Sequence, residues 1–106
     1  MQDLILVLTT APDRASAEKL AEILVNGRLA ACCSIIPGVT STYWWEGKAE
    51  RSEEVLLLVK TSRSLYRRVE AEIKQNHPYR VPEIVALKVE AVLPEYWEWV
   101  KSSVEK

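Results

Sequence analysis

The sequence predicts a single α+β domain, in which helices cover one face of a four-stranded antiparallel sheet. Apolar runs of strand length alternate with helical patterns in the order strand, helix, strand, strand, helix, strand, and one more helical pattern follows. A chain of 106 residues with 48% hydrophobic and 27% charged residues is long enough for one core, so the domain is expected to span residues 1–106. This order is the ferredoxin-like βαββαβ arrangement with a C-terminal helix and a long central hairpin.

The first strand and the first helix have clear signals. Residues 4–8 are apolar at every position, which predicts a central strand that is covered on both faces or paired into an assembly. Pro12-Asp13 is expected to open a helix, and Gly27 to end it as a left-handed cap. The apolar residues of this helix recur at helical spacing: Ala17, Leu20, Ala21 and Leu24.

A long two-stranded arm follows. Its first strand runs from residue 30 to 45 and would span about 50 Å at roughly 3.3 Å per residue. Pro37-Gly38 is the place where a bulge or bend is expected. After the turn Glu46-Gly47-Lys48, a return strand begins with charged residues, expected to be solvated through residue 54, and continues with the apolar run 55–59.

The outer half of this arm carries an aromatic group that its own chain cannot cover, namely Tyr43, Trp44 and Trp45. Such a patch marks an interaction surface: a subunit contact, a platform for nucleobases, or a sugar-binding surface. RNA-recognition domains of this fold place aromatics on the two central strands, and here those strands carry none. We therefore expect the three residues to lie in an interface between copies of the chain, since Trp and Tyr are enriched at interface hot spots.

The second half of the chain adds a helix, a strand and a last helix. The second helix is predicted to begin near Ser62 or Ser64, either of which could cap it, and to end at His77-Pro78. Its predicted core side chains are Leu65, Val69 and Ile73. Residues 79–83 form an extended linker because prolines flank and interrupt it.

The strand at 84–90 is expected to turn Val85, Leu87 and Val89 toward the core. The last helix is expected to start at Pro94 and to align Leu93, Trp97, Val100 and Val104 along one stripe.

One sheet face would lack helices and must find apolar contact elsewhere. The sequence leaves open which residues form it. The first strand offers either Leu4, Leu6 and Leu8 or Ile5 and Val7, and the third offers either Leu56 and Leu58 or Val55, Leu57 and Val59.

Composition narrows the class of protein. A formal net charge of −1 gives no electrostatic basis for binding nucleic acid or an anionic membrane, so neither partner is expected. No secretory leader pattern and no apolar run of about 20 residues is present in the sequence, and a disulfide between the neighbouring Cys32 and Cys33 would be strained. We therefore expect a cytoplasmic protein.

Few residues suggest chemistry. His77, the only histidine, is either a helix-capping residue or a metal ligand that would need partners such as Glu83. Cys32 and Cys33 fit a buried strand as small apolar residues, or one from each copy could converge near a symmetry axis on Cu(I). Nucleophilic motifs and phosphate-binding glycine loops are absent from the sequence, so we do not expect an enzyme.

Several segments together resemble the CutA family, the divalent-cation tolerance proteins, in order along nearly the whole chain. They are Thr10-Ala11-Pro12-Asp13, Leu29-Ala30-Ala31-Cys32, Ile36-Pro37-Gly38, Tyr43-Trp44-Trp45-Glu46-Gly47-Lys48, Lys60-Thr61 and His77-Pro78-Tyr79-Arg80-Val81-Pro82-Glu83. The resemblance implies a tight homotrimer similar to the PII signalling proteins, with hairpins that wrap neighbouring subunits. It also implies an association with copper and other divalent ions, and in animal relatives a link to the membrane anchoring of acetylcholinesterase.

The resemblance also implies residue roles. Four matched positions, Tyr43, Lys60, Tyr79 and Glu83, are expected to line an inter-subunit cleft. Some members carry a cysteine where this chain has Thr9 and a second histidine where it has Asn76, so only His77 of a proposed copper set is retained. Such a site is incomplete here, and binding is either weaker or uses other ligands.

These observations predict a cytoplasmic homotrimer involved in tolerance of, or response to, divalent metal ions. It would bind copper, another divalent ion or a small ligand at clefts between subunits, with His77 and Glu83 as candidate ligands. The alternative is a PII-like signalling or scaffold trimer that binds a protein partner, with metal incidental. A small-molecule hydrolase or transferase would have only Glu83 and His77 as acid or base.

Overall fold

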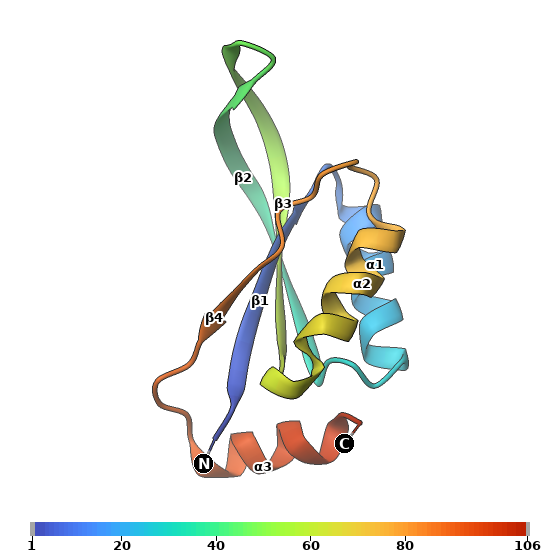
Figure 1. The fold of residues 1–106 in the computed structure, drawn as a ribbon, viewed down its shortest axis with the longest axis vertical. Helices are drawn as coiled ribbons and strands as arrows, with labels where there is room; N and C mark the ends of the chain where they lie inside the picture. The colour runs from blue at the N-terminus through green and yellow to red at the C-terminus, as the bar shows by residue number, and fades with distance from the viewer. Residues whose placement is uncertain (1, 106) are drawn as a thin grey trace.

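A computed structural model, which describes residues 2–105, confirms the ferredoxin-like α+β fold. The elements are β1 (Leu4–Ala11), α1 (Arg14–Asn26), β2 (Cys32–Trp45), β3 (Lys48–Ser62), η1 (Arg63–Leu65), α2 (Tyr66–Asn76), β4 (Val85–Lys88) and α3 (Pro94–Ser103). The strands form one antiparallel sheet in the order β2-β3-β1-β4. Helices α1 and α2 lie on one side of this sheet, and α3 crosses the end opposite the arm (Figure 1).

The main core lies between the sheet and helices α1 and α2. Val7, Leu57 and Val59 point to this side and are fully buried. They pack in one cluster with the helix residues Leu20, Leu24, Val69 and Ile73. Of the alternatives left open by the sequence, the odd-numbered residues of β1 and β3 therefore face the helices, because side chains alternate along a strand.

The opposite sheet face carries apolar side chains that no helix covers over most of its length. Leu6 and Leu8 on β1 and Leu56 and Leu58 on β3 are only half-buried there. The register pairs Val85 with Leu8 and Leu87 with Leu6, so the two β4 residues lie on this same face. We call this set of six residues the open face.

The prediction that Val85 and Leu87 face the core is therefore wrong. Both are about half exposed, at 43% and 51%. Their neighbour Ile84, just before β4, packs against the core instead. Side chains alternate between the two faces of β4, as the sequence predicted. Alternation alone does not show which face of the sheet the helices cover.

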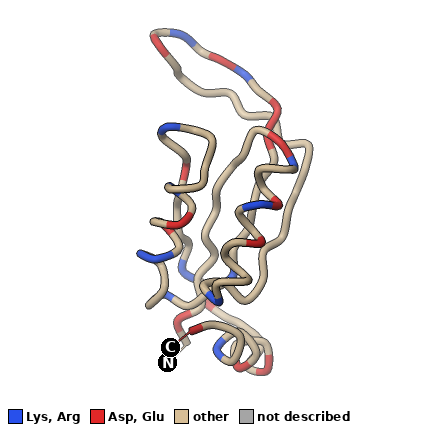
Figure 2. Tube along the Cα trace, turned by 90° about the vertical axis from the view of Figure 1, so that its right-hand side faces the viewer, with Lys and Arg blue, Asp and Glu red and all other residues tan. Residues whose placement is uncertain are grey.

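The arm is the outer half of the β2-β3 hairpin. Its pairing continues to Trp45 and Lys48, with a register shift between Ile36 and Val39 that confirms the bulge expected at Pro37-Gly38. The molecule is 45 Å long and at most 26 Å across its other axes, and the arm extends beyond the helices (Figure 1). Figure 2 shows that the charges of the arm lie at its tip and along one strand, β3, and the other strand, β2, carries none.

The ends of the helices differ in detail from the prediction. Asp13 caps α1 by accepting a hydrogen bond from the Ser16 backbone N–H at 2.8 Å. Gly27 has an ordinary φ of −80°, and the left-handed residue is Arg28, with φ 59°. The Leu29 N–H then bonds the Leu24 carbonyl at 2.9 Å, which completes a Schellman-type end.

Neither serine caps α2 in the way the sequence suggested. A short 3-10 turn, η1, precedes the helix, and Ser62 makes no side-chain cap hydrogen bond. The hydroxyls of Ser62 and Ser64 bond each other at 3.0 Å instead. The three predicted core positions of this segment are nevertheless buried: Leu65, Val69 and Ile73.

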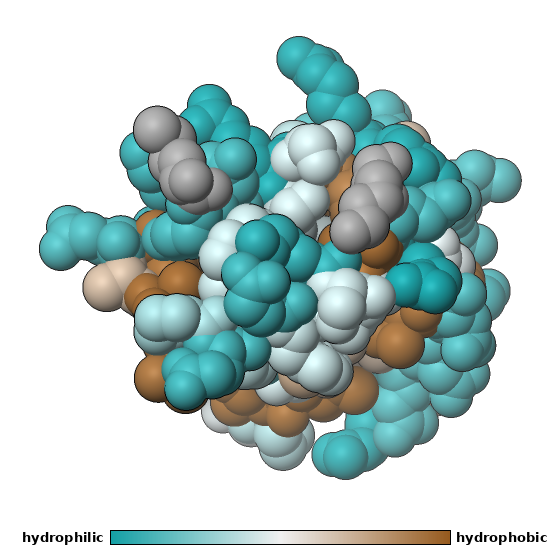
Figure 3. All heavy atoms as spheres, turned by 90° about the horizontal axis from the view of Figure 1, so that it is seen from below, coloured by the Kyte–Doolittle hydropathy of each residue, from teal (hydrophilic) through white to brown (hydrophobic). Residues whose placement is uncertain are grey.

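Helix α3 closes the end of the molecule opposite the arm, where apolar and polar side chains share the surface (Figure 3). Val100 and Val104 are buried as predicted, whereas Leu93 is 65% exposed and lies outside the expected stripe. The Arg28 guanidinium bonds the carbonyls of Ser102 and Ser103, which ties α3 to the end of α1. Within residues 2–105, no helix combines the length and apolar character needed to span a bilayer.

Candidate functional site

A cavity of about 770 Å³ lies where the base of the arm meets the linker between α2 and β4. It has contributions from the end of β1, from both arm strands and from the linker. Its lining residues are Thr10, Ser41, Thr42, Tyr43, Trp45, Glu54, Pro78, Tyr79, Arg80, Val81 and Glu83. This volume is in the range of small-molecule binding sites, and aromatic walls with a few polar groups are typical of them.

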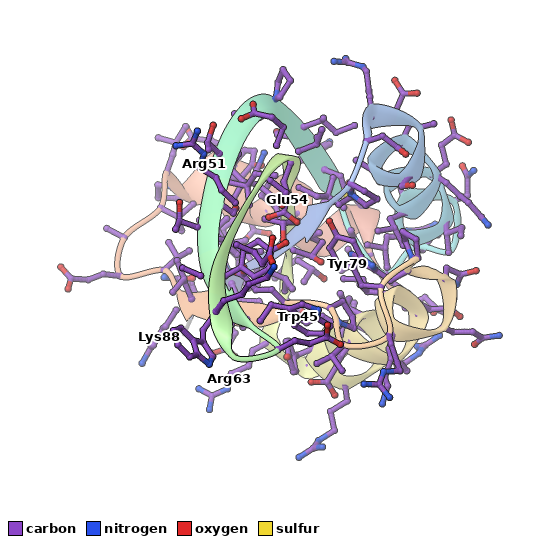
Figure 4. All side chains as sticks on the ribbon, turned by 90° about the horizontal axis from the view of Figure 1, so that it is seen from above. Trp45, Arg51, Glu54, Arg63, Tyr79 and Lys88 are labelled. Atoms are coloured by element: carbon purple, nitrogen blue, oxygen red, sulfur yellow. The ribbon has the colours of Figure 1, made fainter. Side chains whose placement is uncertain are left out.

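Glu54 and Tyr79 form the buried polar centre of the cavity. The Tyr79 hydroxyl donates to Glu54 Oε2 at 2.7 Å, and Glu54 is only 9% exposed. Figure 4 shows the two side chains next to each other. Burial raises the pKa of Tyr79, and the hydrogen bond to Glu54 and the nearby charge of Glu54 raise this pKa further.

His77 positions the linker rather than pointing into the cavity. Its Nδ1 accepts a hydrogen bond from the Tyr79 backbone N–H at 3.0 Å, so Nε2 is the protonated nitrogen and donates to the Thr10 carbonyl at 2.7 Å. The rings of His77 and Tyr79 lie 4.9 Å apart. The histidine therefore joins α2 and the linker to the end of β1.

His77 does lie at the C-terminal end of α2, as expected, but both ring nitrogens are occupied by backbone groups. Binding a metal ion there would require one of these hydrogen bonds to break. The role of His77 as a metal ligand stays a prediction.

The structure brings three of the four predicted cleft residues together in this cavity. Tyr43, Tyr79 and Glu83 line it, and Lys60 does not. Lys60 lies toward the other end of β3, where its ammonium bonds the Ser34 hydroxyl.

The aromatic residues of the arm divide between two sides. Tyr43 and Trp45 line the cavity and are 42% and 48% exposed, whereas Trp44 alternates to the other side and is 74% exposed. Their assignment to a subunit interface stays a prediction.

Sequence reasoning missed Glu54. It placed this residue with the solvated charges of the arm, but Glu54 is the last charged residue before the apolar run of β3 and is buried at the arm base. Its position beside Val55 was the available signal, because a charge next to a buried run is close to the body of the domain.

The two cysteines point to opposite faces of β2, so one chain does not bring both to a shared ion. Cys33 pairs with Val59 and packs against the core, while Cys32 points to the other face, where its sulfur lies 3.7 Å from the Lys60 ammonium. Burial raises the pKa of the Cys33 thiol to about 12, and the charge of Cys32 adds to this rise in pKa. Cys33 is therefore a protonated, apolar-like side chain at neutral pH.

Thr9 and Asn76 are the positions at which some family members carry a cysteine and a second histidine. In this chain both have structural roles. Thr9 is fully buried, and Asn76 donates to the Glu72 carbonyl at 2.9 Å inside α2. In the part of the chain that the structure describes, no group of three or more His, Cys, Asp and Glu side chains is arranged to hold a metal ion.

Comparison with known proteins identifies the family. A model of the family described as CutA1 divalent ion tolerance protein matches residues 5–103. The chain belongs to this family. The resemblance inferred from the motifs is thereby confirmed.

Relatives are similar over nearly the whole CutA1 chain. The divalent-cation tolerance protein CutA of Pectobacterium atrosepticum is 41% identical over 102 residues, which cover 96% of this chain and 93% of that protein. The protein CutA 1, chloroplastic, of rice is 40% identical, and the protein CutA, chloroplastic, of Arabidopsis thaliana is 42% identical. The aligned regions cover 96% and 93% of this chain but span only 58% and 54% of those two plant proteins.

Solved CutA1 structures have the same fold. The crystal structure of CutA1 from Oryza sativa superposes with a TM-score of 0.96 at 39% identity, and covers 99% of this chain and 96% of that one. The divalent cation tolerance protein from Thermus thermophilus gives a TM-score of 0.93 at 41% identity, with 96% and 99% covered.

Proposed function

We propose that this CutA1 chain acts as a homotrimer that takes part in tolerance of, or response to, divalent metal ions, and that it binds an ion or a small ligand at clefts between subunits. The observation that carries the proposal is the cavity at the arm base. It combines the buried Glu54 with the exposed Glu83, and it opens beside the aromatic arm. A neighbouring copy that covers the arm would also close the cavity.

Two uncovered surfaces support assembly. Trp44 on the arm is 74% exposed, and the open face holds six half-buried or exposed apolar side chains. Large contiguous apolar patches on a small domain are typical of protein interfaces. The homotrimer is the arrangement that the family resemblance implied.

The donor atoms of the cavity favour some ions over others. Its side chains offer carboxylate, hydroxyl and phenol oxygens, which suit hard divalent ions better than Cu(I). Copper would depend on His77 or Cys32, and His77 would have to release a backbone partner. We propose copper or another divalent ion as the ligand, with Glu83 as a candidate ligand, and the oxygen donors of the cavity favour the harder ions over copper.

Calorimetric titration tests this proposal. Copper(II) and zinc are titrated separately into the unmodified chain, His77→Ala and Glu83→Gln. We expect binding by the unmodified chain and a loss of about tenfold or more in affinity for Glu83→Gln, since a charged ligand is removed. An isotherm unchanged in both variants would remove both residues from the site, and no heat with either ion would contradict metal binding at this cavity.

A second candidate function is a PII-like signalling or scaffold trimer in which a protein partner is recognised and metal is incidental. The exposed Val81, at 74%, beside the exposed aromatic residues favours it, because apolar and aromatic side chains dominate protein recognition. Recovery of a stoichiometric partner in a metal-free pull-down would support this candidate. For either function, we propose a cytoplasmic protein without enzymatic activity.

A further inference from the structure

Glu54 is an unusual residue for the place that it occupies. A carboxylate that is only 9% exposed normally has an ion pair or several hydrogen bonds, because transfer of a charge out of water is costly. Its Oε2 accepts one bond, from the Tyr79 hydroxyl. Within residues 2–105, Oε1 has no hydrogen-bond partner and Glu54 has no ion-pair partner; Oε1 is not among the fully buried atoms without a partner, so it keeps some exposure toward the cavity that Glu54 lines.

The surroundings of Glu54 add negative rather than positive charge. Glu83 is a second, exposed carboxylate on the cavity wall. The pKa of Tyr79 is raised by burial and by the hydrogen bond to Glu54, and the charges of Glu54 and Asp13 raise this pKa further, which agrees with an excess of negative charge near the Tyr79 hydroxyl. Arg80 also lines the cavity and is exposed, but among the described residues it forms no ion pair with either carboxylate.

The rest of the wall is aromatic and apolar. Tyr43, Trp45 and Tyr79 contribute rings, and Pro78 and Val81 contribute apolar atoms. The faces of aromatic rings attract cations, and this attraction strengthens when the cation leaves water. Thr10, Ser41 and Thr42 complete the polar lining, and of the two β2 residues Ser41 shares the side of Tyr43 and Glu54.

We propose that the cavity binds an organic monocation, a primary alkylammonium, whose charged nitrogen donates to Glu54 Oε1 and whose carbon chain lies between the aromatic side chains. An ammonium group has three donors, and the free carboxylate oxygen of Glu54 offers a charged acceptor in a lining that also contains Thr10 and Ser41. A divalent metal would need several charged oxygens around one point, and the two carboxylates of this wall differ, one buried beside Tyr79 and one exposed on the linker. This ligand class is assigned to the same cavity as the ligand of the proposed function. The proposal rests on that function only because both place a ligand in this cavity.

The test is titration of the full chain with n-butylammonium chloride, followed by calorimetry and by tryptophan fluorescence, to which Trp45 on the cavity wall contributes. The uncharged n-butanol, of nearly the same shape, and sodium chloride at equal ionic strength are the matched ligand controls. We expect saturable binding of n-butylammonium and at least about tenfold weaker binding of n-butanol, because the charged nitrogen contributes the strong hydrogen bond. Equal binding of the two, or no binding of n-butylammonium, would overturn the proposal without the need for any variant.

Variants of the chain then locate the site. Glu54→Gln keeps an acceptor for Tyr79 but removes the charge, and we expect it to weaken n-butylammonium binding by about tenfold or more. Glu53→Gln is the matched control on the same strand, since Glu53 is exposed and bonds the Thr40 hydroxyl at 2.7 Å outside the cavity. Its affinity should stay within about twofold of the unmodified chain, because an exposed charge outside the site contributes little. Equal losses in both variants would contradict a site at Glu54.

The outcome also separates this inference from the proposed function. If zinc or copper binds and n-butylammonium neither binds nor competes, the alkylammonium site is wrong and the proposed metal function stands. If n-butylammonium binds and both metals give no heat, the cavity is a small-ligand site and the metal part of the proposed function fails.

Discussion

Two buried threonines on the helix side of the sheet differ in a single hydrogen bond. Thr61 Oγ1 donates to the Leu29 carbonyl at 2.6 Å, whereas Thr9 Oγ1 is the one buried side-chain polar atom among the described residues without a partner. Both residues are fully buried. An unsatisfied buried hydroxyl costs free energy that an apolar group of the same shape does not.

We expect Thr9→Val to raise the free energy of unfolding by about 1 kcal/mol, because valine has nearly the same shape and leaves no polar atom unpaired. Thr61→Val is the control and should lower it by about 1–3 kcal/mol, because the Leu29 carbonyl would lose its partner. Denaturant titration of the three proteins measures both changes. Similar destabilisation by both substitutions would contradict the unpaired state of Thr9.

Tyr79 is expected to make stability depend on alkaline pH. Because its pKa is raised in the folded protein above the ordinary value of 10.0, its contribution is complete below pH 10 and declines as pH rises above that value. At pH 8, Tyr79→Phe should cost about 1–3 kcal/mol, since the hydrogen bond to Glu54 is lost. The difference between the two proteins should shrink from pH 10 upward in denaturant titrations.

Tyr66 and Tyr96 are the internal control for this experiment. Their pKa values are also raised, chiefly by burial, and both residues are present in each protein. The difference between the two proteins therefore isolates Tyr79. A difference that stays constant to pH 11 would contradict the coupling to Glu54.

At the scale of single elements, the local sequence pattern predicts which helix or strand forms. It does not always predict which residue ends the helix or which residue is buried. The sequence correctly predicted that α1 ends near Gly27, because glycine favours helix ends. The left-handed residue is instead Arg28, whose guanidinium bonds α3 carbonyls more than 70 positions away in the chain. A tertiary contact of this kind has no local signal, and neither does the buried position of Glu54, which depends on the linker that carries Tyr79.

Substitutions in the turn of the arm test how the backbone conformation of this hairpin affects stability. Glu46 and Gly47 have φ values of 48° and 84°, so both central residues of this two-residue turn are left-handed. We expect Glu46→Asn to stabilise the protein by about 0.5 kcal/mol, since Asn adopts this conformation more readily than Glu. Gly47→Ala should cost about 1 kcal/mol, because nothing within 4 Å crowds the site and only the backbone penalty applies. Thermal unfolding checks both, and a loss of stability in Glu46→Asn would contradict the strain assigned to Glu46.

At the scale of the whole molecule, the fold followed from the order of apolar runs, whereas the proposed homotrimer depends on surfaces that one chain leaves uncovered. The open face is apolar on three adjacent strands, β3, β1 and β4, and its members on β4 are about half exposed. Its identity could not be taken from the sequence, because β1 and β3 are apolar on both faces. The packing of Val7, Leu57 and Val59 against the helices decided it, and the strand register added Leu87 opposite Leu6 and Val85 opposite Leu8.

The open face therefore offers a direct test of the proposed homotrimer. In sedimentation at micromolar concentration, we expect the unmodified chain to be trimeric and Leu87→Lys to shift toward the monomer, because a lysine charge would be buried without a partner. Val25→Lys is the control, since Val25 on α1 is 40% exposed, close to the 51% of Leu87, but lies on the helix side of the molecule. It should remain trimeric, since its new charge stays in water. A trimer that is unchanged by Leu87→Lys would mean that copies associate through the arm alone, and a monomeric unmodified chain would remove the inter-subunit cleft altogether.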